Sequence, residues 1–130
     1  MFHYTVETNK SLEEAIEALK LNLETERFGI LWRFNIQEKL QEKGIQFDEP
    51  YVILEVCNPF EAKRVLSEHV LAGYFLPCKI AVYQEKGKTK IGMPKPTSLI
   101  GMVEKDSFDQ LLDIAKDVEK RLTACLDKSI

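Results

Sequence analysis

The stretch YVILEVCNPFEAKRVL, residues 51–66, decides the fold because it places a strand pattern directly before a helix-start signal. Residues 51–57 form an apolar, β-branched run of strand length. Asn58 is a natural helix N-cap, and Pro59 suits the first helical position, where its missing N–H costs nothing. We therefore predict a strand over 51–57 that is followed at once by a helix, with Cys57 at the junction.

The residues that precede this stretch predict two strands and two helices. Residues 2–7 alternate between apolar and polar, which is typical of a half-buried strand. Ser11-Leu12-Glu13-Glu14 matches a capping box and opens an amphipathic helix. Residues 28–36 form the clearest strand, and a short helix over 37–43 ends at Gly44, which can adopt the left-handed cap conformation. Alternation in the strand places these side chains together on the core side: Phe28, Ile30, Trp32, Phe34 and Ile36.

The residues that follow predict a hairpin and a long final helix. Residues 79–84 and 88–93 form two strands around a Glu-Lys-Gly turn at 85–87. Residues 93–96, Met-Pro-Lys-Pro, predict a loop. The last helix is expected to begin near Asp106. Its apolar stripe comprises Phe108, Leu111, Leu112, Ala115, Val118, Leu122 and Cys125.

Together these elements predict one α+β domain over residues 1–130, in the order β-α-β-(α)-β-α-β-β-α. Short strands, a hairpin and amphipathic helices favour a single, mostly antiparallel sheet with the helices packed on one face. The other face then mixes apolar and polar side chains, which is typical of a pocket lining or a subunit interface. Arg33 and Glu55 are expected to pair across this face if their strands are neighbours. Its expected members are Leu31, Arg33, Asn35, Tyr51, Ile53, Glu55, Cys57, Lys79, Ala81 and Tyr83.

The composition is that of a globular protein, with 45% hydrophobic and 30% charged residues. The 18 Lys and Arg residues are scattered among 21 Asp and Glu residues, for a net charge of −3, which argues against a nucleic-acid partner. No apolar run reaches the roughly 18 residues that span a bilayer, and the N-terminal residues lack a secretory-signal pattern. We therefore expect no membrane partner and a cytoplasmic location, where the three cysteines would be reduced thiols.

Three segments of the sequence resemble a known family. They are Cys57-Asn58-Pro59, Leu76-Pro77-Cys78, and the closing helix LLDIAKDVEKRLTACL at 111–126. This CNP motif, this LPC motif and the order of the other elements are similar to the domain-of-unknown-function family numbered three hundred and two, over essentially the whole chain. The resemblance implies a small bacterial or archaeal protein with a TATA-binding-protein-like fold, arranged as a homodimer. It implies neither a reaction nor DNA binding, since a shared fold does not fix function.

Cys57 and Cys78 carry the strongest hint of chemistry, and several roles are open to them. A thiol at the start of a helix can lose its proton more easily, because free N–H groups and the helix dipole stabilise an anion. Two thiolates with one imidazole would suit zinc or copper(I), and two thiols within about 7 Å between Cα atoms could form a disulfide. Free cysteines also often serve as small buried apolar residues. His69 and Cys125 are expected to be packing residues.

Motifs of common enzyme classes do not occur in the sequence: it has no glycine-rich phosphate loop, no GxSxG and no HExxH. We therefore expect a non-enzymatic, homodimeric domain that binds a small ligand on the sheet face or in a dimer cleft, with no cofactor assigned. A thiol-dependent redox or metal-handling protein that uses Cys57 and Cys78 is the alternative, and a purely structural dimer module is a third reading. The candidate site residues are Arg33, Glu55, Cys57, Asn58 and Cys78.

Overall fold

The computed structural model describes residues 1–102 and 108–130. The predicted start of the last helix, near Asp106, lies outside the described residues. In chain order the elements are β1 (His3–Thr8), α1 (Leu12–Thr25), β2 (Gly29–Asn35), α2 (Ile36–Glu42), β3 (Tyr51–Cys57), α3 (Pro59–Glu68), the 3-10 helix η1 (Val70–Phe75), β4 (Cys78–Glu85), β5 (Lys88–Pro94), α4 (Pro96–Ile100) and α5 (Phe108–Lys128).

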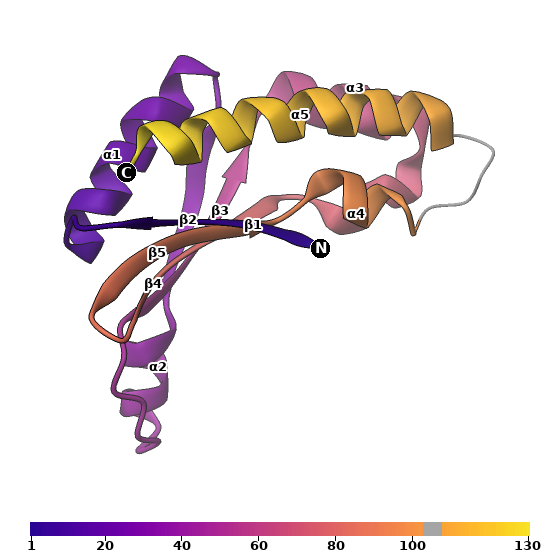
Figure 1. The fold of residues 1–130 in the computed structure, drawn as a ribbon. Helices are drawn as coiled ribbons and strands as arrows, with labels where there is room; N and C mark the ends of the chain where they lie inside the picture. The colour runs from indigo at the N-terminus through magenta and orange to yellow at the C-terminus, as the bar shows by residue number, and fades with distance from the viewer. Residues whose placement is uncertain (103–107) are drawn as a thin grey trace.

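The five strands form one antiparallel sheet in the order β1-β5-β4-β3-β2. Figure 1 shows α1, α3 and α5 over one face of this sheet, whereas α2 projects from its end. This is the predicted α+β architecture, with one sheet and helices packed on one face. We call the other face the open face, because its side chains are only partly buried. Its central side chains are Trp32, Phe34, Tyr51, Ile53, Glu55, Lys79, Ala81 and Tyr83.

The main core lies between the sheet and the helices, and the predicted helix start at Ser11 helps to fix it. The Glu14 N–H donates to Ser11 Oγ (3.2 Å), and the Ser11 N–H donates to Glu14 Oε1 (3.1 Å). This reciprocal pair is a capping box, which satisfies N–H groups that the first turn of α1 leaves free. Core side chains with 0% exposure are Ala15, Leu19, Leu23, Val52, Leu54, Val56, Ile80, Val82, Ile91 and Leu126.

The hairpin between β4 and β5 turns at Lys86 and Gly87, whose φ angles of 53° and 78° are both positive. Two consecutive residues with positive φ are typical of a type I′ turn, which matches the twist of paired strands. The turn lies where the sequence predicts it, although β5 runs on to Pro94. The loop predicted at 93–96 is wrong, because α4 begins at Pro96. A proline ring fits the first turn of a helix, so this residue starts α4 instead of breaking it.

The pairing of β2 with β3 contains a bulge at Leu31. Ile30 pairs with Val56, but the next pair in the register joins Trp32 to Glu55. Leu31 is therefore an additional residue on β2. A bulge reverses the alternation of side chains beyond it, because each one-residue shift exchanges the two faces of the sheet.

This reversal corrects two predictions. Trp32 and Phe34, expected in the core, lie on the open face, where their rings stack with centroids 5.2 Å apart. Arg33, expected on the open face, points to the helix side and pairs with Glu13 of α1, with Nη1 3.1 Å from Oε2. The pair predicted between Arg33 and Glu55 therefore does not form.

Candidate functional site

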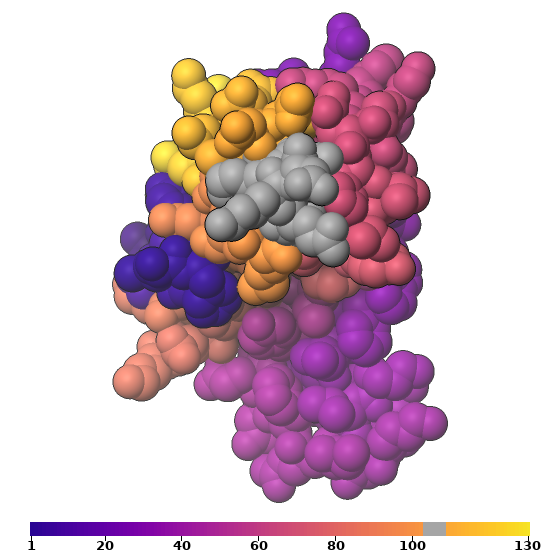
Figure 2. Space-filling model, turned by 90° about the vertical axis from the view of Figure 1, so that its right-hand side faces the viewer, coloured from indigo at the N-terminus to yellow at the C-terminus, as the bar shows by residue number. Residues whose placement is uncertain are grey.

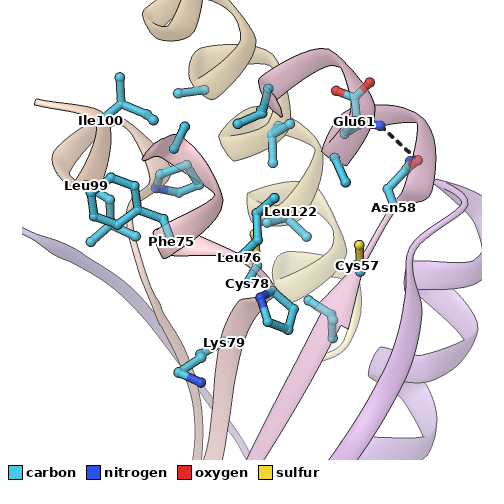
Figure 3. Close-up of a pocket in the computed structure, with 18 of the residues that line it drawn as sticks. Cys57, Asn58, Glu61, Phe75, Leu76, Cys78, Lys79, Leu99, Ile100 and Leu122 are labelled. Carbon is cyan, nitrogen blue, oxygen red and sulfur yellow. Dashed lines mark hydrogen bonds between the residues drawn. The ribbon is translucent and has the colours of Figure 1, made fainter. Parts of the chain in front are cut away.

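A cavity of about 400 Å³ lies between the helices and one end of the sheet. Its walls come from α3, α5, η1 and α4 and from the adjoining ends of β3, β4 and β5 (Figure 3). Most of the lining side chains are apolar, which makes the interior unfavourable for an unpaired charge. The apolar lining residues include Val56, Ala62, Val65, Ala72, Phe75, Leu76, Met93, Leu99, Ile100, Leu111, Ile114, Ala115, Val118 and Leu122.

The cavity lies between two separate hydrophobic clusters. The larger cluster is the main core, which contributes Val56 and Leu122 to the lining. The smaller cluster belongs to η1, α4 and α5; Figure 2 shows this end of the molecule, where the pink segment of α3 and η1 lies beside the orange segments of α4 and α5. Close-packed interiors leave few voids larger than a water molecule, so this space marks a boundary between the two packed clusters. The smaller cluster consists of Ala72, Ile100, Leu111 and Ala115.

Cys57 and Cys78 both line the cavity, from the end of β3 and the start of β4. Cys78 pairs with Val56 in the sheet register, so the two cysteines are near neighbours on adjacent strands. Burial raises the pKa of the Cys57 thiol, and burial together with the nearby Cys57 raises the pKa of Cys78 to about 11. This direction is opposite to the lowering expected for Cys57 at a helix start, since desolvation outweighs the helix dipole there.

Asn58 fixes one wall of the cavity, and its side chain is buried at 4% exposure. Its Oδ1 accepts the N–H groups of Phe60 (3.0 Å) and Glu61 (3.4 Å), which confirms the predicted N-cap of α3. Its Nδ2 donates to the backbone oxygen of Glu26, just after α1 (3.0 Å). Both ends of the Asn58 amide are thus used within the protein, where they hold the start of α3 against the end of α1.

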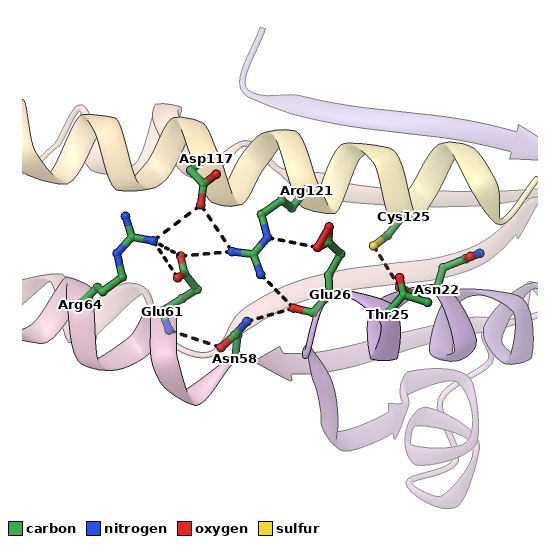
Figure 4. A network of polar contacts seen from close by, with 9 residues as sticks. All are labelled: Asn22, Thr25, Glu26, Asn58, Glu61, Arg64, Asp117, Arg121 and Cys125. Atoms are coloured by element: carbon green, nitrogen blue, oxygen red, sulfur yellow. Dashed lines mark hydrogen bonds and ion pairs between the residues drawn. The ribbon is translucent and has the colours of Figure 1, made fainter.

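A network of charges closes the wall between α3 and α5 (Figure 4). Arg64 Nη1 donates to both carboxylate oxygens of Glu61, at 2.7 and 2.9 Å. Arg121 of α5 lies 3.4 Å from the same carboxylate and also pairs with Asp117 and Glu26, each at 3.4 Å. Glu61 lines the cavity with a side chain that is only 11% exposed. The guanidinium groups of Arg64 and Arg121 therefore neutralise the Glu61 carboxylate, which lines the cavity.

Four of the five predicted site residues line the same cavity. Arg33 is separate, because the bulge turns it toward Glu13 of α1. Glu55 pairs with Lys79 on the neighbouring strand, with 2.9 Å between Oε1 and Nζ. The four predicted residues that line the cavity are Glu55, Cys57, Asn58 and Cys78.

Most of the cavity wall has no recognisable signal in the sequence. Phe75 of η1 and Leu99 of α4 come from segments for which the sequence predicts no regular structure. These two helices have six and five residues, too few to show a helical period. Glu61 also escapes notice, because an acidic residue in the first turn of a helix is ordinarily explained by the helix dipole.

Among residues 1–102 and 108–130 there is neither a metal-binding cluster nor a helix suited to cross a membrane. These residues contain no group of three or more His, Cys, Asp or Glu side chains placed to hold a metal ion. The imidazole of His69 instead accepts the N–H of Leu71 at the start of η1 (3.2 Å), so it is not combined with the two thiols. No described helix has both the length and the apolar character needed to cross a membrane.

Comparisons with known proteins give a family and a fold without an activity. The profile of the family described as "Domain of unknown function DUF302" matches residues 4–129. A solved structure, titled as the uncharacterized conserved protein DUF302 from Bacillus stearothermophilus, is 59% identical to this chain and superposes with a TM-score of 0.95. The match covers 100% of this chain and 99% of that one. None of the curated proteins compared with the sequence matches it. The family resemblance noted in the CNP and LPC motifs is thus confirmed.

Proposed function

Because the chain belongs to the family described as domain of unknown function DUF302, whose description names no activity, we propose a function from the cavity: the protein binds a small apolar molecule there. The observation that supports this proposal is a pocket of about 400 Å³ that is lined mainly by apolar side chains. Ligand pockets typically measure roughly 300–1,000 Å³ and are lined largely by hydrophobic and aromatic residues. The proposed site is on the helix side of the sheet, not on the open face that sequence analysis favoured.

Filling the cavity at Ala115 tests this proposal. Ala115 of α5 lines the cavity and is 4% exposed. We expect N-phenyl-1-naphthylamine, a neutral fluorescent probe, to bind the wild-type protein with a rise in fluorescence. Ala115→Leu is expected to weaken this binding at least about tenfold, because the larger side chain occupies space that the probe needs. Fluorescence titration of both proteins measures the two dissociation constants.

Ala124→Leu is the matched control, since it makes the same change on the same helix at a half-buried position outside the cavity lining. It should leave probe affinity within about twofold of wild type, as expected for a position away from the site. Thermal unfolding of all three proteins distinguishes loss of the site from loss of the fold. Probe binding that is equal in Ala115→Leu and wild type, or absent from folded wild-type protein, would overturn the proposal.

We also propose that two copies of the chain associate through the open face. The supporting observation is the aromatic character of this face: Trp32, which is 53% exposed, stacks on Phe34 at 5.2 Å, and Tyr51 stacks on Tyr83 at 4.9 Å. An exposed apolar patch of this kind is typical of an interaction surface. A two-fold axis parallel to the plane of the sheet, lying between the two copies, would bring each aromatic pair against the same face of the other copy.

The dimer proposal predicts the effect of Trp32→Glu. This variant is expected to be monomeric, because the contact would bury a carboxylate without a partner. Sedimentation velocity over a wide range of protein concentrations measures the molecular mass. The control is Phe60→Glu, which alters an aromatic residue on α3 that is 63% exposed, and it should associate like wild type. A wild-type protein that stays monomeric at the highest concentration would show that the open face does not pair with itself.

A further inference from the structure

Among the described residues, every charged side chain that lines the cavity is matched within the protein. The charged lining residues are Glu55, Glu61 and Lys79. Glu55 and Lys79 pair with each other on the open face of the sheet, with 2.9 Å between Oε1 and Nζ, so Glu61 is the charged lining residue on the helix side. Glu61 receives Arg64 on both of its oxygens and lies 3.4 Å from Arg121. A ligand that entered with its own charge would have to break one of these pairs to find a counter-charge.

The remaining polar side chains of the described lining are neutral, and apart from the exposed Tyr74 they are committed elsewhere or are weakly polar. Asn58 uses its Oδ1 to cap α3 and its Nδ2 to bind the Glu26 carbonyl. Cys57 and Cys78 are thiols, which are weak hydrogen-bond donors, and burial keeps both of them protonated. Within the described part of the chain, no buried side-chain nitrogen or oxygen lacks a hydrogen-bond partner. Tyr74, which is 83% exposed, adds a neutral phenolic hydroxyl, so the described lining offers a ligand no free charge.

We infer from this pairing that the cavity takes an uncharged, hydrocarbon-rich molecule, an inference that rests on the binding function proposed above. A charged group in the cavity would lose its water without gaining a free counter-charge, which is strongly unfavourable. Burial of a hydrocarbon chain is instead favourable, and its binding free energy improves in proportion to the apolar area that is buried. In Figure 3, Phe75, Leu99 and Ile100 lie across from Cys57 and Asn58. A ligand between them would contact hydrocarbon on one side and neutral thiol on the other.

A series of ligands with the same chain and different head groups tests the inferred class. The compounds are 1-decanol, decanoate and decylammonium, each used at pH 7.5 to displace bound N-phenyl-1-naphthylamine. We expect decanol to displace the probe and both ions to bind at least about tenfold more weakly. Only the ions must transfer a charge from water into an apolar cavity. Ala115→Leu should weaken decanol binding as well, which places the competition in the cavity and not elsewhere on the surface.

A variant that frees one charge tests the reason for this selectivity. Glu61→Gln removes the carboxylate that Arg64 and Arg121 share on the helix side of the cavity, and we expect it to strengthen decanoate binding at least about fivefold relative to decanol. Glu85→Gln is the matched control, because it frees Lys90 from a similar pair (2.7 Å) outside the cavity lining. It should leave the relative affinities of decanoate and decanol unchanged.

The outcomes separate failure of the inferred class from failure of the proposed function. If the ions displace the probe as well as decanol does, or if Glu61→Gln and Glu85→Gln behave alike, the inferred class is wrong while binding in the cavity stands. If neither the probe nor decanol binds the folded wild-type protein, the binding function itself is wrong and the inference falls with it.

Discussion

Asn58→Ala is expected to lower the free energy of unfolding by about 2–3 kcal/mol, roughly 10 °C in melting temperature for a domain of this size. The variant loses the N-cap of α3, because Oδ1 no longer accepts the N–H groups of Phe60 and Glu61. It also loses the hydrogen bond from Nδ2 to the carbonyl of Glu26, which joins the start of α3 to the end of α1. Urea unfolding followed by circular dichroism measures the difference.

Asn35→Ala is the matched control for this prediction. Asn35 caps α2, where its Oδ1 accepts the N–H of Glu38 at 3.0 Å in an exposed setting. Its loss is expected to cost only about 1 kcal/mol or less, because α2 has seven residues and buries none of them. A loss at Asn58 no larger than the loss at Asn35 would mean that the link to Glu26 contributes no stability.

Alkylation of Cys78 by iodoacetamide is expected to be about 100-fold slower in the folded protein at neutral pH than in the same chain unfolded in urea. The thiolate is the reactive form, and burial raises the pKa of Cys78 from an ordinary value of 9.0 to about 11. At neutral pH the folded protein therefore holds far less thiolate, and the rate should keep rising with pH until about 11. Peptide mass spectrometry locates and times the modification.

The raised pKa of Cys78 also predicts the direction in which the stability of the protein changes with pH. Above pH 9.0 the unfolded chain ionises Cys78, whereas the folded protein keeps the proton until about pH 11. The contribution of this group to stability is therefore fully present below pH 9.0 and is lost as the pH rises toward 11. Rapid alkylation of Cys57 or Cys78 with a midpoint below about 8.5 would contradict this assignment. That result would favour the alternative, a thiol redox or metal-handling protein.

Local signals explain the parts of the fold that the sequence predicts correctly. The strand over 51–57, the N-cap at Asn58 and the capping box at Ser11 each depend on residues only a few positions apart. The turn at Lys86 and Gly87 is equally local, because a glycine can adopt positive φ without strain. Local chemistry therefore predicted where most elements begin and end.

Features that depend on distant residues were predicted only in part. The bulge at Leu31 exists in the pairing of β2 with β3, and the run of apolar residues at 30–32 does not show which residue is the additional one. Trp32, Phe34 and Arg33 were therefore assigned to the wrong faces. The approach of Cys57 to Cys78 was proposed only on the condition that their strands were adjacent, which the β3–β4 register satisfies. The cavity also needs η1 and α4, which are too short to leave a pattern in the sequence.

The position of β1 at the edge of the sheet, beside β5, has a consequence for the chain while it is being made. β1 is synthesised before the other described strands, yet it pairs with β5. His3 therefore cannot pair until its partner Pro94 has been synthesised. At a translation speed of about 5–20 residues per second, the wait lasts on the order of ten seconds. The hairpin of β4 and β5 needs only a local turn and can form at once, whereas docking β1 must first close a long loop. A nascent chain therefore carries an unpaired, half-apolar strand until β5 appears, and this is the interval in which a chaperone would have a segment to bind.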